Sequence, residues 1–186
     1  MIGAVLAGGA GSRLGAASKP GALLAGRPLV SYPVAALAEV CSRVAVVCKA
    51  STALPALEGV DRWDEPDSPR HPLTGIVYAL EWAGEPVLVC AADMPFVTAD
   101  ACRSLLTAPQ KSVAVVAAAE GVLQPVFAVY APGALERLRA AAEDAPLTRT
   151  VEALDPTRVA LPPQVVASVN TPEELAEAER LLVTSH

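Results

Sequence analysis

Residues 2–19 read IGAVLAGGAGSRLGAASK, and this stretch decides the fold prediction. Residues 2–8 form a short apolar run with the length and composition of a buried β-strand. The glycines that follow allow positive φ angles and a close approach of backbone N–H groups to an anion. Arg13 and Lys19 add fixed positive charge. The stretch therefore predicts a strand that runs into a polyphosphate-binding loop.

Two well-known phosphate loops do not match this stretch. A Walker loop has Lys directly after its second conserved glycine, whereas Ala16 follows Gly15 here. A dinucleotide-binding loop needs an acidic residue at the end of the second strand, and that strand is predicted to end in Cys48 and Lys49. A reductase that binds NAD(P) is therefore disfavoured, although it stays as an alternative.

Outward from the loop, short runs rich in β-branched residues alternate with longer segments whose apolar residues have the spacing of a helix. This alternation predicts a Rossmann-like, three-layer α/β domain with a mostly parallel sheet and helices on both faces. No repeat or linker interrupts residues 1–186, which predicts a single domain. The predicted strands are residues 2–8, 43–49, 86–93, 111–119 and 124–130. The predicted helices are residues 27–40, 72–84, 98–106 and 132–144, and a last helix that starts with a capping box at Thr171 and Glu174. Residues 64–72 and 162–164 are predicted loops.

Ligands of such a sheet bind at the carboxyl ends of its strands. Asp93 follows an apolar strand, and Asn170 is expected at the end of another strand. A carboxylate in this position either caps a turn or binds a metal ion, and the neighbouring phosphate loop favours the metal. Mg²⁺ takes one or two protein oxygens together with phosphate and water oxygens. Asp93 and Asn170 are therefore the candidate ligands of a Mg²⁺ cofactor, with helix entry as the other reading of Asn170.

Composition and charge exclude several classes of function. The chain has a net charge of −6 and only 4% aromatic residues, which disfavours binding of nucleic acid. Residues 1–38 nevertheless contain three basic and no acidic side chains, so the phosphate loop lies in a locally positive segment. The four cysteines form no C-x-x-C pair, which disfavours a structural zinc site, and three of them lie in or beside apolar runs and are expected to be buried. No signal peptide or membrane span is recognisable, so a cytoplasmic protein without a membrane partner is expected.

The chain resembles the MobA-like nucleotidyltransferases, and in particular the molybdenum cofactor guanylyltransferases. Leu6-Ala7-Gly8-Gly9 with Arg13, Gly15 and Lys19 is similar to the L-A-G-G-x-x-x-R-x-G-x-x-x-K signature of enzymes that join an NTP to a phosphorylated acceptor. The resemblance covers nearly the whole chain. Its further motifs are residues 26–29 (GRPL), 72–76 (PLTGI), 93–96 (DMPF), 124–130 (QPVFAVY) and 169–175 (VNTPEEL).

This resemblance implies a Mg²⁺-dependent transfer of GMP from GTP to the phosphate of molybdopterin, with release of pyrophosphate. It also implies transient contact with other enzymes of molybdenum cofactor synthesis. The residues to which it gives roles are Arg13, Lys19 and Asp93 in catalysis, Leu6, Ala7, Gly8, Gly9, Lys19, Asp64 and Asp93 in nucleotide binding, Asp93 and Asn170 at the metal, and Gln124 and Arg149 on the acceptor side.

The sequence departs from the family pattern at Ser18, at His71 and at Ser168, where the family often has Asp, Gly and Asn. These departures leave the choice of base and acceptor open. A cytidylyltransferase acting on the same pterin, or a transferase acting on another small phosphorylated acceptor, therefore stays as an alternative. A catalytically silent nucleotide-binding module is the third alternative; it is disfavoured because such a module has no need of Arg13, Lys19, Asp93 and Asn170 together.

Overall fold

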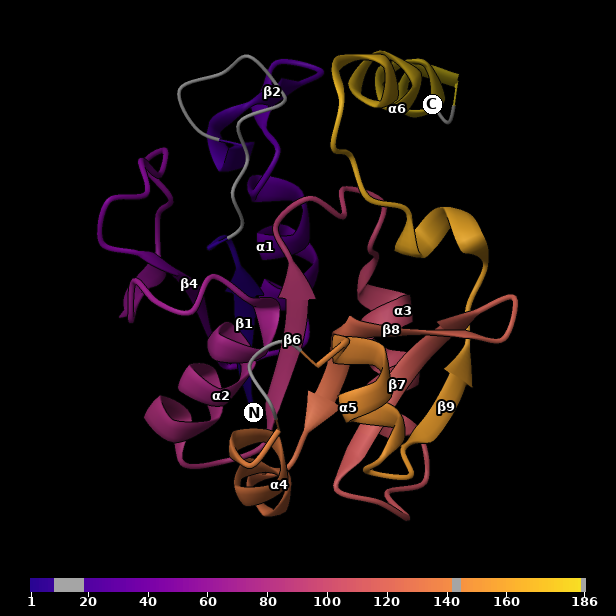
Figure 1. Ribbon diagram of the computed structural model, residues 1–186. Coiled ribbons are helices and arrows are strands. Elements are labelled where there is room, and N and C mark those ends of the chain that lie inside the picture. Colours follow the sequence, from indigo (N-terminus) through magenta and orange to yellow (C-terminus); the bar gives the residue numbers. More distant parts are fainter. Residues whose placement is uncertain (9–18, 142–144, 185–186) are drawn as a thin grey trace.

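A seven-stranded sheet forms the centre of the structure, a computed structural model in which residues 1–8, 19–141 and 145–184 are described (Figure 1). The strand order is β5-β4-β1-β6-β8-β7-β9. β8 pairs antiparallel with both of its neighbours and the other pairs are parallel, so the predicted mostly parallel sheet is confirmed. The strands are β1 (Ile2–Leu6), β4 (Arg43–Lys49), β5 (Val60–Glu65), β6 (Val87–Ala91), β7 (Ala114–Ala119), β8 (Val122–Tyr130) and β9 (Thr157–Ala160).

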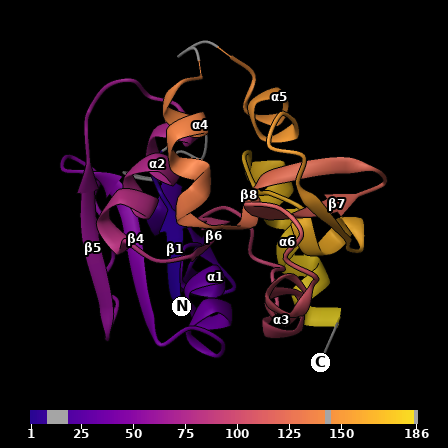
Figure 2. The same cartoon turned by 90° about the horizontal axis from the view of Figure 1, so that it is seen from below.

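Helices cover both faces of this sheet, as predicted. One face packs against α1 (Ser31–Ala38) and α3 (Ala99–Thr107), and the other against α2 (Pro72–Ala83), α4 (Leu135–Arg139) and α5 (Leu147–Glu152) (Figure 2). Side chains alternate between the two cores along each strand. In β1, for example, Val5 belongs to the core under α1 and Ala4 to the core under α2.

The two strands β5 and β9 were not predicted from the sequence. β5 has the sequence VDRWDE, and β9 has the sequence TRVA. Both lie at the edges of the sheet, where one side of the strand and part of its surface face solvent. Their polar composition follows from this position, and it hides the apolar run by which a buried strand is recognised. The predicted loop at residues 64–72 is therefore shorter, since β5 continues to Glu65 and α2 begins at Pro72.

Two of the predicted helices have different boundaries. The helix expected over residues 27–40 begins at Ser31, because β3 (Arg27–Pro28) pairs with β2 (Leu23–Leu24) in a hairpin. Ala25 and Gly26 turn this hairpin with positive φ angles of 47° and 77°. The segment expected to be one helix over 132–144 contains the 3₁₀ turn η3 (Pro132–Ala134) and α4, which ends at Arg139.

The carboxyl-terminal helix α6 (Pro172–Thr184) begins where the capping box was predicted. The backbone N–H of Glu174 donates to Thr171 Oγ1 at 3.2 Å, and the N–H of Thr171 donates to Glu174 Oε2 at 3.1 Å. α6 packs against the β2–β3 hairpin through a small separate core that includes Leu24, Val169 and Ala178. Figure 1 shows the helix beside this hairpin, above the carboxyl ends of the central strands.

The prediction that Asn170 ends a strand was wrong. β9 ends at Ala160, and the 3₁₀ turn η4 (Pro163–Val166) separates it from an irregular segment over residues 167–171. The backbone N–H of Val169 in this segment donates to the carbonyl oxygen of Asp93 at 2.8 Å. This hydrogen bond, together with the burial of Val169, holds Asn170 beside the end of β6.

Cys48, Cys90 and Cys102 are buried, as expected from the apolar runs around them, and Cys41 is partly exposed. Burial raises the pKa of the Cys41 and Cys48 thiols to about 11. No helix in the described part of the chain has the length and apolar composition that a crossing of the lipid bilayer requires.

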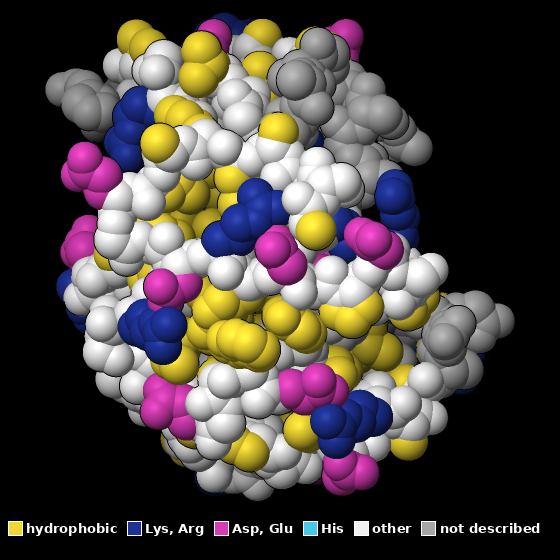
Figure 3. Space-filling view, turned by 90° about the vertical axis from the view of Figure 1, so that its left-hand side faces the viewer, with side chains coloured by type: hydrophobic (Ala, Val, Ile, Leu, Met, Phe, Trp, Pro, Cys, Tyr) yellow, Lys and Arg dark blue, Asp and Glu magenta, His cyan; other side chains and the backbone are white. Residues whose placement is uncertain are grey.

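The outer surface of α2 carries aromatic side chains. Trp82 is 62% exposed, and its ring stacks on that of Tyr78 with 5.9 Å between the centroids. On the side of the molecule that lies at the left of Figure 1, hydrophobic side chains gather in a hollow bordered by acidic and basic ones (Figure 3). Charges of both signs are mixed over this face.

Candidate active site

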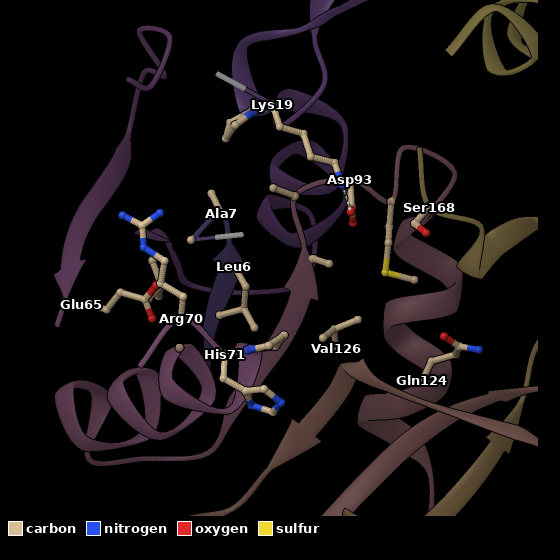
Figure 4. Close-up of a pocket in the computed structure, with 18 of the residues that line it drawn as sticks. Leu6, Ala7, Lys19, Glu65, Arg70, His71, Asp93, Gln124, Val126 and Ser168 are labelled. Atoms are coloured by element: carbon tan, nitrogen blue, oxygen red, sulfur yellow. Dashed lines mark hydrogen bonds and ion pairs between the residues drawn. The ribbon is translucent and has the colours of Figure 1, made fainter. Parts of the chain in front are cut away.

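A cavity of about 250 Å³ opens at the carboxyl ends of β1, β4 and β6, the edge of the sheet at which ligands were predicted to bind. Its floor comes from the end of β1 (Leu6, Ala7 and Gly8), and Lys19 and Asp93 lie above it (Figure 4). Figure 4 shows two opposite sides of this cavity. Glu65 and Arg70 lie on the side toward β5, and Gln124 and Ser168 lie on the opposite side, beyond Asp93.

Three polar side chains from distant parts of the sequence meet at one point of this cavity. Lys19 Nζ donates to Asp93 Oδ2 at 2.5 Å and to Asn170 Oδ1 at 2.6 Å. The amide group of Asn170 donates to Ser168 Oγ at 3.0 Å, which fits the orientation with Oδ1 toward the lysine. The side chains of Lys19 and Asp93 are 18% and 21% exposed. The ion pair therefore lies within reach of a ligand that enters the cavity.

This cluster fits a magnesium ion. The carboxylate oxygen of Asp93 and the amide oxygen of Asn170 converge on a single positive charge, that of Lys19. A carboxylate and an amide oxygen are ligands that Mg²⁺ uses when phosphate and water complete its shell. Among the described residues there is no group of three or more His, Cys, Asp or Glu side chains that could bind a metal ion without such help.

A second lysine–carboxylate pair lies on the β5 side of the cavity. Lys49 Nζ is 3.2 Å from Glu65 Oε1, and both side chains are 5% exposed. Lys49 also donates to the carbonyl oxygen of Pro66, while Glu65 Oε2 is buried and has no hydrogen-bond partner among the described residues. Burial raises the pKa of the Glu65 carboxyl group, and the hydrogen bond and charge of Lys49 act in the opposite direction.

Glycines make room for the Glu65 carboxylate. A Cβ atom on Gly8 would lie 1.9 Å from Glu65 Oε1, and a Cβ atom on Gly75 would lie 3.1 Å from Oε2. Both distances are shorter than a relaxed contact, and the first is far inside the van der Waals limit. The absence of a side chain at Gly8 thus allows the carboxylate to pack against the end of β1.

The structure brings most of the predicted site residues together. Those that line the cavity are Leu6, Ala7, Gly8, Lys19, Asp93 and Gln124, and Asn170 reaches it through Lys19. Gly9 and Arg13, to which the resemblance gives roles at the phosphates, lie outside the described residues. Asp64 and Arg149 are not part of the cavity lining.

Asp64 and Glu65 are neighbours in β5 and point to opposite sides of the strand. Trp63 and Glu65 are buried, whereas Asp64 is exposed and pairs with Arg62, with 2.7 Å between Oδ1 and Nε. The position expected to contact the nucleotide therefore faces solvent in this structure, and its neighbour lines the cavity. Arg149 is likewise exposed, on α5.

Sequence reasoning gave no role to Glu65 or Arg70, and it noted His71 only as a departure from the family pattern. All three line the cavity. His71 is the N-cap of α2, where its Nδ1 accepts the N–H of Leu73 at 3.2 Å. The alternation of buried and exposed residues in VDRWDE was the available signal for Glu65, and it becomes readable only when the segment is recognised as a strand.

The fold and the site together define a nucleotidyltransferase of the α/β type with a mostly parallel sheet. Residues 3–159 match the family model of the MobA-like NTP transferase domain. The chain is 32% identical to a molybdenum cofactor guanylyltransferase of Cereibacter sphaeroides, an alignment that covers 98% of this chain and 97% of the relative. The chain belongs to the MobA-like NTP transferase family.

Solved structures share the fold. The molybdopterin-guanine dinucleotide biosynthesis protein A of Archaeoglobus fulgidus aligns with a TM-score of 0.78 and 23% identity, over 99% of this chain and all of the other. The 2-C-methyl-D-erythritol 4-phosphate cytidylyltransferase of Thermus thermophilus aligns with a TM-score of 0.74 and 20% identity, over 97% of this chain and 98% of the other. Both solved structures therefore share this arrangement of strands and helices with the chain.

Proposed function

We propose that this protein transfers the GMP group of GTP to the phosphate of molybdopterin, forming molybdopterin guanine dinucleotide and pyrophosphate. The observation that carries the proposal is the convergence of Lys19, Asp93 and Asn170 beside the end of β1. The name of the Cereibacter sphaeroides relative supplies the base and the acceptor.

The reaction exchanges one phosphoanhydride bond for another. An oxygen of the pterin phosphate forms a bond to the α-phosphorus of GTP, and the bond between that phosphorus and the bridging oxygen to the β-phosphorus breaks. The electron pair leaves with pyrophosphate. No covalent enzyme intermediate is needed, so the work of the protein is positioning and neutralisation of charge.

Both reactants are anions, and this repulsion is the main obstacle. Two unit charges about 4 Å apart repel by roughly 4 kcal/mol at an effective dielectric constant near 20. Lys19 exchanges its contact with Asp93 for the α-phosphoryl group, where its charge stabilises the transition state. Asp93 and Asn170 would hold Mg²⁺, which supplies positive charge to the phosphates when it is bound. Arg13 is proposed to contact the β- and γ-phosphates.

The acceptor is proposed to lie on the side of the cavity opposite Glu65. Gln124 and Ser168 offer polar groups there, next to the apolar side chain of Val126. Arg149 is retained as a candidate for the acceptor side, and Asp64 as a candidate for the nucleotide. A cytoplasmic location and transient contact with other enzymes of molybdenum cofactor synthesis belong to the same proposal, without nucleic acid or membrane partners.

The test is release of pyrophosphate from GTP, CTP or ATP in the presence of molybdopterin and Mg²⁺. The proposal expects release with GTP that depends on both molybdopterin and Mg²⁺. Release with CTP alone would replace it by the cytidylyltransferase alternative. Absence of release with every nucleotide would favour a silent nucleotide-binding module, and activity without Mg²⁺ would remove the metal from the proposal.

A further inference from the structure

The segment that carries Asn170 is irregular, so its position depends on individual hydrogen bonds. Residues 167–171 lie between η4 and α6 and belong to neither. The N–H of Val169 donates to the carbonyl oxygen of Asp93 at 2.8 Å, which ties the segment to the end of β6. This bond does not set the direction of the Asn170 side chain, because the soft backbone torsions of Val169 and Asn170 follow it.

A single carboxylate oxygen restrains the backbone of Asn170. Glu174 Oε2 accepts the N–H of Asn170 at 2.6 Å and the N–H of Thr171 at 3.1 Å. These two N–H groups belong to the rigid peptide planes on either side of the Asn170 Cα atom. Because both planes are held by one oxygen, the φ and ψ angles of Asn170 are held as well, and with them the direction in which its side chain leaves the backbone.

The capping of α6 requires one of these two bonds. In a capping box, the glutamate at the third helical position accepts the N–H of the cap residue, here Thr171, and the side chain of the cap residue accepts the N–H of the glutamate. Asn170 precedes the cap residue. Its bond to Glu174 is the shorter of the two and lies outside the capping box, so it serves the placement of Asn170 itself.

The amide group of Asn170 is oriented by further contacts. Its Oδ1 accepts from Lys19 Nζ at 2.6 Å, and its Nδ2 donates to Ser168 Oγ at 3.0 Å. Lys19 also donates to Asp93. We propose that Glu174 is a positioning residue, which holds Asn170 Oδ1 at the place where it contacts Lys19 and, in the loaded site, Mg²⁺. This inference rests on the metal position of the proposed function and assigns the placement of one metal ligand to a residue outside the cavity lining.

Binding of GTP without molybdopterin tests the inference apart from the transfer reaction. Calorimetry gives the Kd of GTP in EDTA and in Mg²⁺, and the first constant divided by the second measures the contribution of the metal. Glu174→Ala should lower this ratio ~10-fold and leave the Kd in EDTA nearly unchanged, because it frees a metal ligand from the group that orients it. An unchanged ratio in Glu174→Ala would overturn the inference.

Glu174→Gln is the conservative variant. Its amide oxygen can accept the same two N–H groups, and glutamine also serves in capping boxes. The ratio should therefore stay within about twofold of the wild type, since the hydrogen bonds that place Asn170 are kept. A loss as large as that of Glu174→Ala would show that the charge of Glu174, and not the position of Asn170, determines the effect, and the inference would fail.

Thr171→Ala is the matched control for helix capping. It removes the other half of the same capping box but keeps the oxygen that accepts the N–H of Asn170. Glu174 is exposed, so neither substitution opens a cavity in a core, and both should lower the melting temperature by a similar, small amount. The metal ratio should fall in Glu174→Ala alone. Equal falls in the two variants would reduce Glu174 to a helix cap.

Asn170→Ala shows whether Glu174 acts through Asn170. This substitution should lower the metal ratio by itself. Adding Glu174→Ala to the same chain should then cause no further fall, because the group that Glu174 positions is already absent. Additive falls would mean that Glu174 acts on the site by another route, contrary to the inference.

The outcomes separate this inference from the proposed function. A protein whose ratio falls in Glu174→Ala but which transfers nothing to molybdopterin would contradict only the proposed transfer. A protein that transfers GMP, and whose ratio falls in Asn170→Ala but not in Glu174→Ala, would contradict only the role of Glu174. A wild-type ratio of one would contradict both the metal and the inference. If Glu174→Ala does not fold, as judged by circular dichroism, Glu174→Asp decides in its place, because its shorter side chain is not expected to reach both N–H groups.

Discussion

Two lysine–carboxylate pairs border the cavity and differ in burial and in partners; Lys19, Asp93 and Glu65 line it, and Lys49 lies behind Glu65. The pair of Lys49 and Glu65 is 5% exposed on both sides and is further held by the carbonyl oxygen of Pro66. The pair of Lys19 and Asp93 is 18% and 21% exposed and shares its lysine with Asn170. Each pair joins a lysine to a carboxylate, but the two pairs differ in their access to solvent. Glu65 of the buried pair lines the cavity, and we propose that the open pair exchanges partners when a nucleotide enters.

The difference follows from the elements that carry each pair. Lys49 and Glu65 end adjacent parallel strands and face each other in register. Lys19, Asp93 and Asn170 belong to three segments outside the sheet strands, which meet only in the folded chain. Buried pairs lose much of their attraction to desolvation, and removal of one partner leaves an uncompensated charge. Pairs that remain partly exposed contribute little to stability and can be broken at low cost.

The largest effect is expected from Asp93→Asn in the open pair. The substitution removes the negative charge at the proposed metal position, so turnover with GTP and molybdopterin should fall about 100-fold. The backbone hydrogen bond from Val169 to the carbonyl oxygen of residue 93 is unaffected, and the melting temperature should change little. Asp100→Asn on α3 is the control, since Asp100 pairs with Arg103 on the surface and should keep full activity. Near-normal turnover of Asp93→Asn would remove Asp93 from the site.

Replacing each lysine by methionine compares the two pairs directly. Lys49→Met leaves the Glu65 carboxylate buried and unpaired, so the free energy of unfolding should fall by about 3 kcal/mol. Lys19→Met should lower it by less than about 1 kcal/mol, yet it should reduce turnover by at least about tenfold. Urea unfolding and pyrophosphate release measure the two quantities. Equal losses of stability in the two variants would contradict the view that the Lys49–Glu65 pair stabilises the fold and the Lys19–Asp93 pair does not.

A smaller effect is expected from Gly8→Ala. The added methyl group would lie 1.9 Å from Glu65 Oε1, so either the end of β1 or the carboxylate must move. Crowding of this kind costs about 1–3 kcal/mol of stability. The double variant Gly8→Ala, Glu65→Ala removes the crowding atom and should show a smaller loss than the sum of the two single changes. Additive losses would indicate that the two residues do not contact each other.

The smallest effect is a pH dependence of stability that arises from Glu65. Burial raises the pKa of this carboxyl group above its ordinary value of 4.5, so the folded state favours its protonated form. Its contribution to stability is complete below 4.5 and is lost as the pH rises through the raised pKa. The free energy of unfolding of the wild type, measured relative to Glu65→Gln in urea, should therefore decrease from acidic to neutral pH. An increase over the same range would show that Lys49 outweighs burial.

Much of the cavity around the end of β1 and Asp93 was predictable from local sequence. The glycine-rich loop after an apolar strand pointed to Leu6, Ala7 and Gly8, and the carboxylate after the strand ending at Ala91 pointed to Asp93. Both signals are local, because a buried parallel strand reads as an apolar run and its carboxyl end lies at the ligand edge. The capping box at Thr171 likewise located the start of α6 within one residue.

The side of the cavity formed by Glu65 at the end of β5 was not predictable in the same way. An edge strand with the sequence VDRWDE lacks the apolar run that identifies a buried strand, so its alternation of exposed and buried residues could not be used. The family resemblance named Asp64, and Glu65 received no role. The contact of Lys19 with Asn170 depends on an irregular segment held by the N–H of Val169, and no pattern in the sequence specifies that hydrogen bond.

A crystal structure with a non-hydrolysable GTP analogue and Mg²⁺ tests the account most directly, because it reports on both pairs at once. Lys19 is expected to leave Asp93 and contact the α-phosphate, Asp93 and Asn170 to bind the metal ion, and Glu65 to stay paired with Lys49. An unchanged pair of Lys19 and Asp93, with the nucleotide bound elsewhere, would contradict it.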